Sequence, residues 1–187
     1  MEDDDLLALG VVVERDRGSL PFTLIHGESL VACAAWAMGE AGIRLLDLST
    51  PWEAVREAGL SLVWHDALCP MTPPDFLAAC ARRALTDGVV TAGVHPVTDT
   101  VKEVIETLGG PMVGATHDRD ELRHLASPLV LPPAVVAALE DWPSSDLREA
   151  LASVASKHRV VWVDAPPSAR RVRDADDVLA LAAITRR

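Results

Sequence analysis

The stretch LSLVWHDALCP (residues 60–70) decides the fold class, because it joins an apolar run to polar side chains. Leu60–Trp64 is typical of a strand that is buried on both faces, and the run ends abruptly at His65 and Asp66. In an open parallel sheet, ligands bind just beyond the carboxyl ends of the strands. Asp66 is therefore the first candidate for a functional side chain.

Strands and helices alternate along the chain on both sides of this stretch. Further apolar runs of strand length occur at residues 6–14, 43–48, 89–95 and 159–164, with a short extended segment at 23–26. Helical patterns occur at residues 28–41, 51–59, 72–88, 132–142, 144–158 and 174–187. Because such alternation favours right-handed crossovers, we expect an α/β protein with a mostly parallel sheet, in which the run at 159–164 is buried.

Three of the predicted helices begin at residues that commonly cap a helix. Thr72 is expected to cap the helix at 72–88, and Ser144 or Ser145 the helix at 144–158. Asp174 is expected to cap the last helix, where its side chain can accept a hydrogen bond from a free backbone N–H.

Residues 96–118 have a different pattern, which predicts a β-hairpin that projects from the sheet. β-branched residues lie on both sides of the break Gly109-Gly110-Pro111. Such a break is typical of a tight turn between two extended segments. We call residues 96–118 the arm.

Composition limits the class of protein. The 187 residues are 49% hydrophobic, which suits one domain over residues 1–187. The formal net charge is -11 and no basic run occurs, so nucleic acid is not expected as a partner. No apolar stretch is long enough to span a membrane, and the acidic start MEDDD is unlike a secretory signal, so we expect a cytoplasmic protein.

Four segments resemble, in chain order, the motifs of the methylerythritol-phosphate cytidylyltransferase family. They are LVWHDALCPMTPP (residues 62–74), PVTDTVKEV (96–104), HDRDELRHLASP (117–128) and APPSARRVRDADDVLALA (165–182). The resemblance implies a Rossmann-like nucleotidyltransferase fold of the GT-A-like type. It also implies the family's reaction, in which a cytidine nucleotide is joined to a sugar-alcohol phosphate and pyrophosphate is released.

The resemblance assigns catalytic roles on the body of the protein to Asp66 and Arg171. Asp66 matches the carboxylate that holds a divalent metal, which implies Mg²⁺ as cofactor. From the local pattern alone, an Asp after a strand is as well explained as the cap of a turn. Arg171 stands where the family has a phosphate-binding Lys, and the neighbouring Arg170 is an alternative.

On the arm and just beyond it, the resemblance assigns roles to Thr100, Lys102 and Arg119. Thr100 and Lys102 match positions near the sugar-phosphate site, although a turn with a solvated Lys explains the local pattern as well. Arg119 matches a catalytic arginine that one subunit contributes to the phosphate bound by the other. The arm is therefore expected to make a homodimer, and Arg suits the role because its planar fork can hold two phosphate oxygens.

The loop after the first strand departs from the family pattern, which has several glycines, an Arg and a Lys around the triphosphate. In GVVVERDRGSLPFTLIHGESL (residues 10–30) the loop itself keeps only Gly18, and Phe22 replaces the Lys. Arg15 or Arg17 could replace the missing Arg as a substrate-binding cation. The segment that helps to hold the cytidine is also absent, so CTP binding is doubtful and we expect the base pocket to be lost.

Three hypotheses for the function remain open. The first is a divergent, impaired cytidylyltransferase-like protein, or pseudoenzyme, that keeps a site for a phosphorylated small molecule. The second is an active CTP-dependent methylerythritol-phosphate cytidylyltransferase of isoprenoid synthesis, in which Arg15 or Arg17 rebuilds the loop. The third is a non-catalytic structural or interaction protein whose cations are ordinary surface residues.

Overall fold

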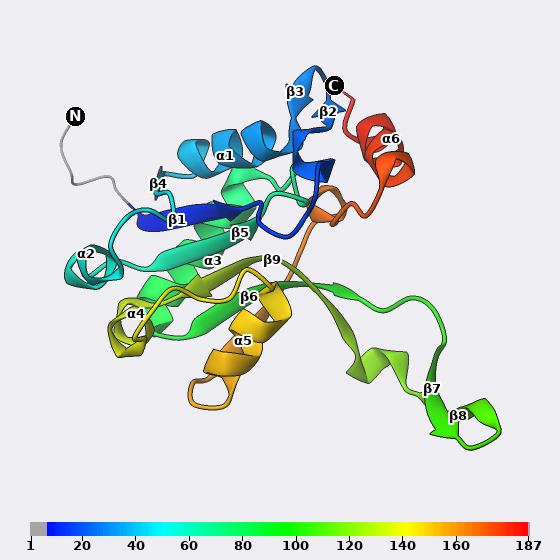
Figure 1. Cartoon of the computed structure of the whole chain (residues 1–187). Coiled ribbons are helices and arrows are strands. Elements are labelled where there is room, and N and C mark those ends of the chain that lie inside the picture. The colour runs from blue at the N-terminus through cyan, green and yellow to red at the C-terminus, as the bar shows by residue number, and fades with distance from the viewer. Residues whose placement is uncertain (1–6, 187) are drawn as a thin grey trace.

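Six strands form the central sheet of the computed structural model, which describes residues 7–186 (Figure 1). In spatial order they are β10 (Val160–Asp164), β6 (Val90–Pro96), β9 (Arg123–Leu131), β5 (Leu62–Asp66), β1 (Ala8–Val13) and β4 (Ile43–Leu45). β9 is antiparallel to both neighbours, and the other neighbouring pairs are parallel. The structure therefore confirms the α/β class with a mostly parallel sheet. The predicted strand start at Leu6 lies outside the described residues.

β9 is a strand of the central sheet that the sequence did not predict. Its sequence RHLASPLVL opens with polar residues and contains Pro128, so it lacks the continuous apolar run of the other central strands. Pro in a sheet is normally confined to edges and irregularities, because it has no N–H to donate. The ladder between β9 and β6 is indeed irregular between Ala92 and Val94, next to Pro128.

Helices cover both faces of the sheet. One face is packed by α1 (Leu30–Glu40) and α3 (Pro74–Asp87), and the other by α2 (Trp52–Glu57), α4 (Pro133–Ala138) and α5 (Leu147–Ala155). α6 (Ala175–Ile184) packs beside the small hairpin of β2 (Leu24–Ile25) and β3 (Glu28–Ser29). Short 3₁₀ turns are η2 (Leu20–Phe22), η3 (Arg119–Glu121) and η4 (Pro167–Ala169).

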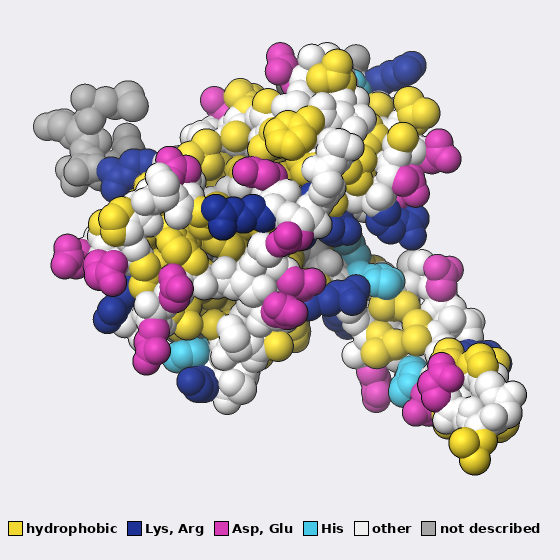
Figure 2. All heavy atoms as spheres, viewed as in Figure 1, with side chains coloured by type: hydrophobic (Ala, Val, Ile, Leu, Met, Phe, Trp, Pro, Cys, Tyr) yellow, Lys and Arg dark blue, Asp and Glu magenta, His cyan; other side chains and the backbone are white. Residues whose placement is uncertain are grey.

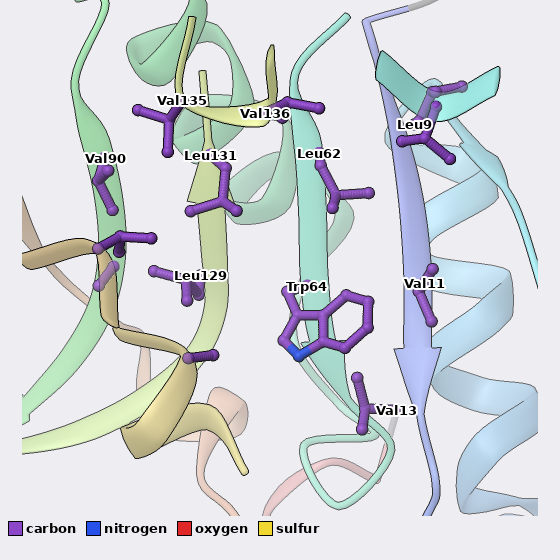
Figure 3. Packing of buried hydrophobic residues seen from close by; sticks show 14 of the residues in the cluster. Leu9, Val11, Val13, Leu62, Trp64, Val90, Leu129, Leu131, Val135 and Val136 are labelled. Atoms are coloured by element: carbon purple, nitrogen blue, oxygen red, sulfur yellow. The ribbon is translucent and has the colours of Figure 1, made fainter. Parts of the chain in front are cut away.

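The core around Trp64 determines where the loop before α5 lies. Trp64 on β5 is buried among the aliphatic side chains of the neighbouring strands (Figure 3). Its ring stacks on Trp142 with the centroids 5.9 Å apart, and its Nε1 donates a hydrogen bond to the backbone oxygen of Ser144 at 2.9 Å. Because a buried indole N–H needs an acceptor, this contact holds residues 142–146 over the carboxyl ends of β1 and β5.

The structure corrects two predicted helix caps and confirms the third. Asp174 caps α6 by accepting a hydrogen bond from the backbone N–H of Asp177. Ser144 and Ser145 do not cap α5, because Asp146 takes that place and accepts from two backbone N–H groups. Thr72 does not cap α3 either, because its hydroxyl donates to the backbone oxygen of Cys69.

The strand at the edge of the sheet, β10, is more exposed than expected. Its side chains are half-buried or exposed, and Trp162 is 51% exposed. β10 has a partner strand on one side only, and its sequence VVWVD is equally typical of a fully buried strand and of an edge strand. The prediction of a buried strand was therefore wrong in its burial, although right in its position.

The arm extends away from the body of the protein as a two-stranded hairpin (Figure 1). β7 (Val101–Thr107) and β8 (Gly110–His117) are antiparallel, and they meet at a turn in which Gly110 has φ 108°. This positive φ is readily adopted by glycine alone, which explains why the break falls there. The predicted hairpin is confirmed, and nearly all of its side chains are exposed.

The surface shows no continuous basic area on the face drawn in Figure 2, where Lys and Arg are scattered among acidic side chains. The prediction that nucleic acid is not a partner stays a prediction. Among residues 7–186, none of the helices is both long and apolar enough to cross a membrane.

Candidate functional site

Asp66 lies at the carboxyl end of β5, where the sequence placed it, and only 3% of it is exposed. Its backbone N–H donates to the Oγ of Ser127 at 2.9 Å, and its Oδ1 accepts from the backbone N–H of Leu68 at 2.9 Å. β1 lies alongside, with Val13 in register with Asp66. The carboxylate is therefore held in one orientation at the edge where α/β proteins bind ligands.

Arg17 reaches this carboxylate from the loop after β1. Its Nε and Nη2 lie 3.3 Å from Oδ1 and Oδ2 of Asp66, and Nη2 also donates to the backbone oxygen of Ser145 at 2.8 Å. The Arg17 side chain is only 10% exposed. A two-pronged contact to a carboxylate is the geometry for which a guanidinium is suited, so Arg17 is a fixed part of the site.

Arg171 approaches Asp66 from the segment before α6. Its Nε donates to Oδ2 of Asp66 at 3.0 Å, while 42% of its side chain remains exposed. Arg170 pairs instead with Asp177, at 3.3 Å. The structure thus selects Arg171 over Arg170 as the residue that faces the site.

The charges of this cluster do not cancel. Two guanidinium groups and one carboxylate give a net charge of +1 (2 − 1). Neither Nη atom of Arg171 has a hydrogen bond to any residue in the range 7–186, and the exposed half of this side chain faces solvent. The cluster of Asp66, Arg17 and Arg171, which we call the Asp66 cluster, can therefore accept a small anion.

Two residues beneath the cluster were not predicted to belong to the site. The Oγ of Ser127 lies 2.6 Å from Nδ1 of His65 and also accepts the backbone N–H of Asp66. Complete burial lowers the pKa of His65 to about 4, so its ring is neutral near pH 7. The contacts of Ser127 join positions more than 60 residues apart, so no local pattern predicts them. The sequence signal for Ser127 was its position in one of the four family-like segments.

Cys69 lies close to the same cluster. It is 1% exposed, and burial raises the pKa of its thiol to about 12. The nearby carboxylate of Asp66 acts in the same direction, while Arg17 and Arg171 oppose it. Cys69 is therefore a neutral packing residue and adds no cation to the site.

The other predicted site residues do not reach Asp66 within one chain. Thr100 and Lys102 are exposed, and the Arg119 side chain donates to the backbone oxygen of Thr98 at 3.1 Å. Arg15 is also exposed and lies beside a different hollow. The structure thus brings together Asp66, Arg17 and Arg171, and it leaves the roles of the remaining residues as predictions.

The hollow beside Arg15 has a volume of about 500 Å³ and lies at the carboxyl ends of β1 and β4. Its polar lining includes Glu14, Asp47 and Ser49, and Arg15 is the one Lys or Arg among the described residues that line it. Asp47 accepts hydrogen bonds from the hydroxyl and the backbone N–H of Ser49, which hold the pKa of its carboxyl below the usual value. The hollow is thus acidic, and the expected loss of the base pocket stays a prediction.

The predicted Mg²⁺ does not fit the Asp66 cluster as it is arranged. Oδ1 and Oδ2 of Asp66 together accept four N–H groups, from Arg17, Arg171 and Leu68. Within residues 7–186, no group of three or more His, Cys, Asp or Glu side chains is arranged to hold a metal ion. The metal role of Asp66 stays a prediction from the resemblance.

No protein-family profile matches the chain, but individual relatives do. The 2-C-methyl-D-erythritol 4-phosphate cytidylyltransferase of Corynebacterium diphtheriae is 29% identical over 109 residues, which are 58% of this chain and 38% of that enzyme. The enzyme of the same name from Bordetella petrii is 42% identical over 74 residues, 40% of this chain and 31% of that enzyme. The matched region thus spans about a third of these relatives.

Solved structures resemble the chain over nearly its whole length. The 2-C-methyl-D-erythritol 4-phosphate cytidylyltransferase of Thermus thermophilus superposes with a TM-score of 0.66 at 16% identity, covering 95% of this chain and 97% of that one. The 4-diphosphocytidyl-2C-methyl-D-erythritol synthase of Anaerococcus prevotii gives 0.65 at 16% identity, covering 96% and 97%. These matches confirm the nucleotidyltransferase fold and, with the sequence similarity, the resemblance to this family.

Proposed function

We propose that this chain, which resembles the methylerythritol-phosphate cytidylyltransferases in sequence and shares their fold, is a divergent protein. It binds a phosphorylated small molecule at the Asp66 cluster, and it binds CTP poorly. The observation that carries this proposal is the net positive, largely buried arrangement of Asp66, Arg17 and Arg171. A fixed carboxylate orients the two guanidinium groups before an anion arrives, so the binding of the anion costs less side-chain conformational entropy.

Arg171 is the residue best placed to contact a phosphate. Its Nε is held by Asp66, which leaves Nη1 and Nη2 free to donate on its exposed side. Two parallel N–H groups match two oxygens of a phosphate. Arg17 contributes positive charge rather than hydrogen bonds to the anion, because its N–H groups already donate largely to Asp66, Ser145 and Arg15.

Weak CTP binding is supported by the charge along the path that a triphosphate would take. Glu14 and Asp16 are exposed in the loop after β1, and Asp47 lines the nearby hollow. Asp16 accepts a hydrogen bond from the hydroxyl of Ser145, which ties this loop to the segment before α5. Carboxylates beside three linked phosphates repel them unless cations intervene, and this loop has no lysine.

The arm is proposed to pair with a second copy of the chain. Val104, Ile105, Leu108, Met112 and Val113 are apolar and at least 43% exposed, and Figure 2 shows apolar side chains at the end of the arm. Such an exposed apolar group is unfavourable in water unless something covers it. In a homodimer, Arg119 of one subunit would add a third cation to the anion site of the other.

A second candidate function, an active cytidylyltransferase, is favoured by two observations. Arg17 does supply a cation to the site from the loop after β1. The hollow of about 500 Å³ at the ends of β1 and β4 is also available to a ligand. If instead the cations were surface residues of a purely structural protein, charge reversal at Lys102 and Arg119 would leave sugar-phosphate binding unchanged.

One experiment separates these functions. The purified protein is mixed with CTP, MgCl₂ and 2-C-methyl-D-erythritol 4-phosphate, and pyrophosphate release is followed with a coupled assay. We expect no release above background, while the same sugar phosphate alone raises the melting temperature by mass action. Robust release would establish the active enzyme, and no thermal shift with either ligand would support the structural protein.

A further inference from the structure

We infer that the Asp66 cluster binds its phosphorylated ligand without a divalent cation, with Arg17 and Arg171 in the place that the cation would need. This inference rests on the proposed function, and it goes further by naming the chemistry of the site. The resemblance implies Mg²⁺, whereas the residues of this chain leave no room for it at Asp66.

Asp66 has no lone pair left for a cation. An ionised carboxylate offers about four hydrogen-bond acceptor positions, two on each oxygen. Oδ1 accepts from Arg17 Nε and the backbone N–H of Leu68, and Oδ2 accepts from Arg17 Nη2 and Arg171 Nε. A metal at Asp66 would have to displace at least one guanidinium.

Displacing Arg17 from Asp66 is unfavourable. Its side chain is 90% buried and is also tied to the backbone oxygens of Arg15 and Ser145. Without the carboxylate, its charge would remain buried beside a doubly charged ion. Arg171 is easier to displace because 42% of its side chain is exposed, but its guanidinium would then lose the 3.0 Å contact to Oδ2, its one hydrogen bond to any residue in the range 7–186.

The neighbouring carboxylates of Asp146 and Asp16 do not complete a metal site. The Oδ1 of Asp146 caps α5 by accepting from the backbone N–H groups of Arg148 and Glu149, which lower the pKa of its carboxyl, with a smaller contribution from the nearby charge of Arg17. Asp16 accepts from Ser145. Mg²⁺ prefers six oxygen ligands in an octahedron, which these separately engaged side chains do not offer.

The binding experiment uses the full chain with 2-C-methyl-D-erythritol 4-phosphate in isothermal titration calorimetry, once with EDTA and once with MgCl₂. We expect dissociation constants that agree within about 2-fold. Binding at least about 10-fold weaker in EDTA would overturn the metal-free site while leaving the proposed function intact. No binding under either condition would overturn the proposed function itself.

Two variants locate the binding in the cluster. Arg171→Gln, at a half-exposed position, should weaken binding at least about 10-fold in EDTA, while Arg170→Gln should leave it within about 2-fold. The latter is a matched control because Arg170 is the adjacent arginine and pairs with Asp177 instead. Equal losses in both variants would contradict the assignment.

A direct metal titration completes the test. Free Mn²⁺ is followed by electron paramagnetic resonance as MnCl₂ is added to the wild-type chain and to Asp66→Asn. We expect the two titrations to coincide, because any weak binding comes from the other acidic surface residues. If the wild-type chain binds Mn²⁺ and Asp66→Asn does not, a metal binds at Asp66 and the inference is wrong.

Discussion

The Asp66 cluster and the arm hold the two halves of the predicted site, and they differ in how their charges are satisfied. In the cluster, every acceptor position of a 3% exposed carboxylate is used before any ligand arrives. On the arm and at its base, Lys102 and Arg119 are exposed, and the side chain of Arg119 donates to a backbone oxygen, with no ion pair to any carboxylate among residues 7–186.

This difference shows which half can act within a single chain. Buried charges must be paired in the fold itself, so the geometry of the cluster is set when the protein folds. Exposed charges are solvated and need a second surface to give them a position. We therefore expect the cluster to be preformed for the proposed anion, and the arm residues to need the proposed second subunit.

The largest expected effect comes from removing the charge of the buried carboxylate. Asp66→Asn keeps the shape of the side chain but leaves Arg17 buried without its counterion, so we expect a loss of about 3 kcal/mol in the free energy of unfolding. Urea denaturation at pH 7 measures it. The matched control is Asp87→Asn, which breaks the exposed Arg83–Asp87 pair at 3.3 Å and should cost about 0.5 kcal/mol or less. Equal losses would mean that the cluster is as solvated as the surface.

A second effect, spread over about two pH units, is expected from acidification through His65 beneath the cluster. Burial lowers the pKa of His65 to about 4 from 6.5, so the unfolded chain binds its proton first. Stability from this group is complete above pH 6.5 and declines as the pH falls toward 4, by up to about 1.4 kcal/mol per pH unit.

His65→Asn is the variant that tests this pH dependence, because Asn can still bond Ser127 but does not titrate. Between pH 6.5 and 4, the unfolding free energy of the variant should fall less steeply than that of the wild type. Parallel curves in urea denaturation would show that the His65 ring is protonated as easily in the folded protein as in the unfolded chain.

The sheet and the arm show how far local sequence determines this fold. β1 and β5 were predictable, because each is a continuous apolar run, and the arm was predictable from Gly109-Gly110-Pro111. β9 was not, because polar residues and Pro128 mask its pattern. Its place between β5 and β6 depends on pairing with strands far away in the sequence, which local patterns do not encode.

The site divides in the same way. Asp66 was predictable from its position after a strand, and Arg171 from the resemblance. The choice of Arg17 over Arg15 was not predictable, because both lie in one short loop and only the fold brings Arg17 to a carboxylate 49 positions away. Ser127 was missed because its hydroxyl acts through the backbone of Asp66 and the ring of His65.

The smallest effect on stability, and the sharpest test of the arm, is expected from Val104→Asp. Val104 lies opposite Val113 in the hairpin, and the two are 63% and 68% exposed. A change at such a surface position should alter the unfolding free energy of the chain by about 0.5 kcal/mol or less. In sedimentation velocity, however, we expect a dimer for the wild type and a monomer for the variant, because a charge would enter the apolar contact.

Arg119→Glu supplies the control that separates assembly from ligand binding. If Arg119 reaches the partner's phosphate, this variant should remain a dimer but bind 2-C-methyl-D-erythritol 4-phosphate more weakly, whereas Val104→Asp should lose both properties. A wild type that sediments only as a monomer at working concentration would remove the second subunit from the site. The Asp66 cluster would then have to bind its anion with Arg17 and Arg171 alone, which the exposed Nη groups of Arg171 still permit.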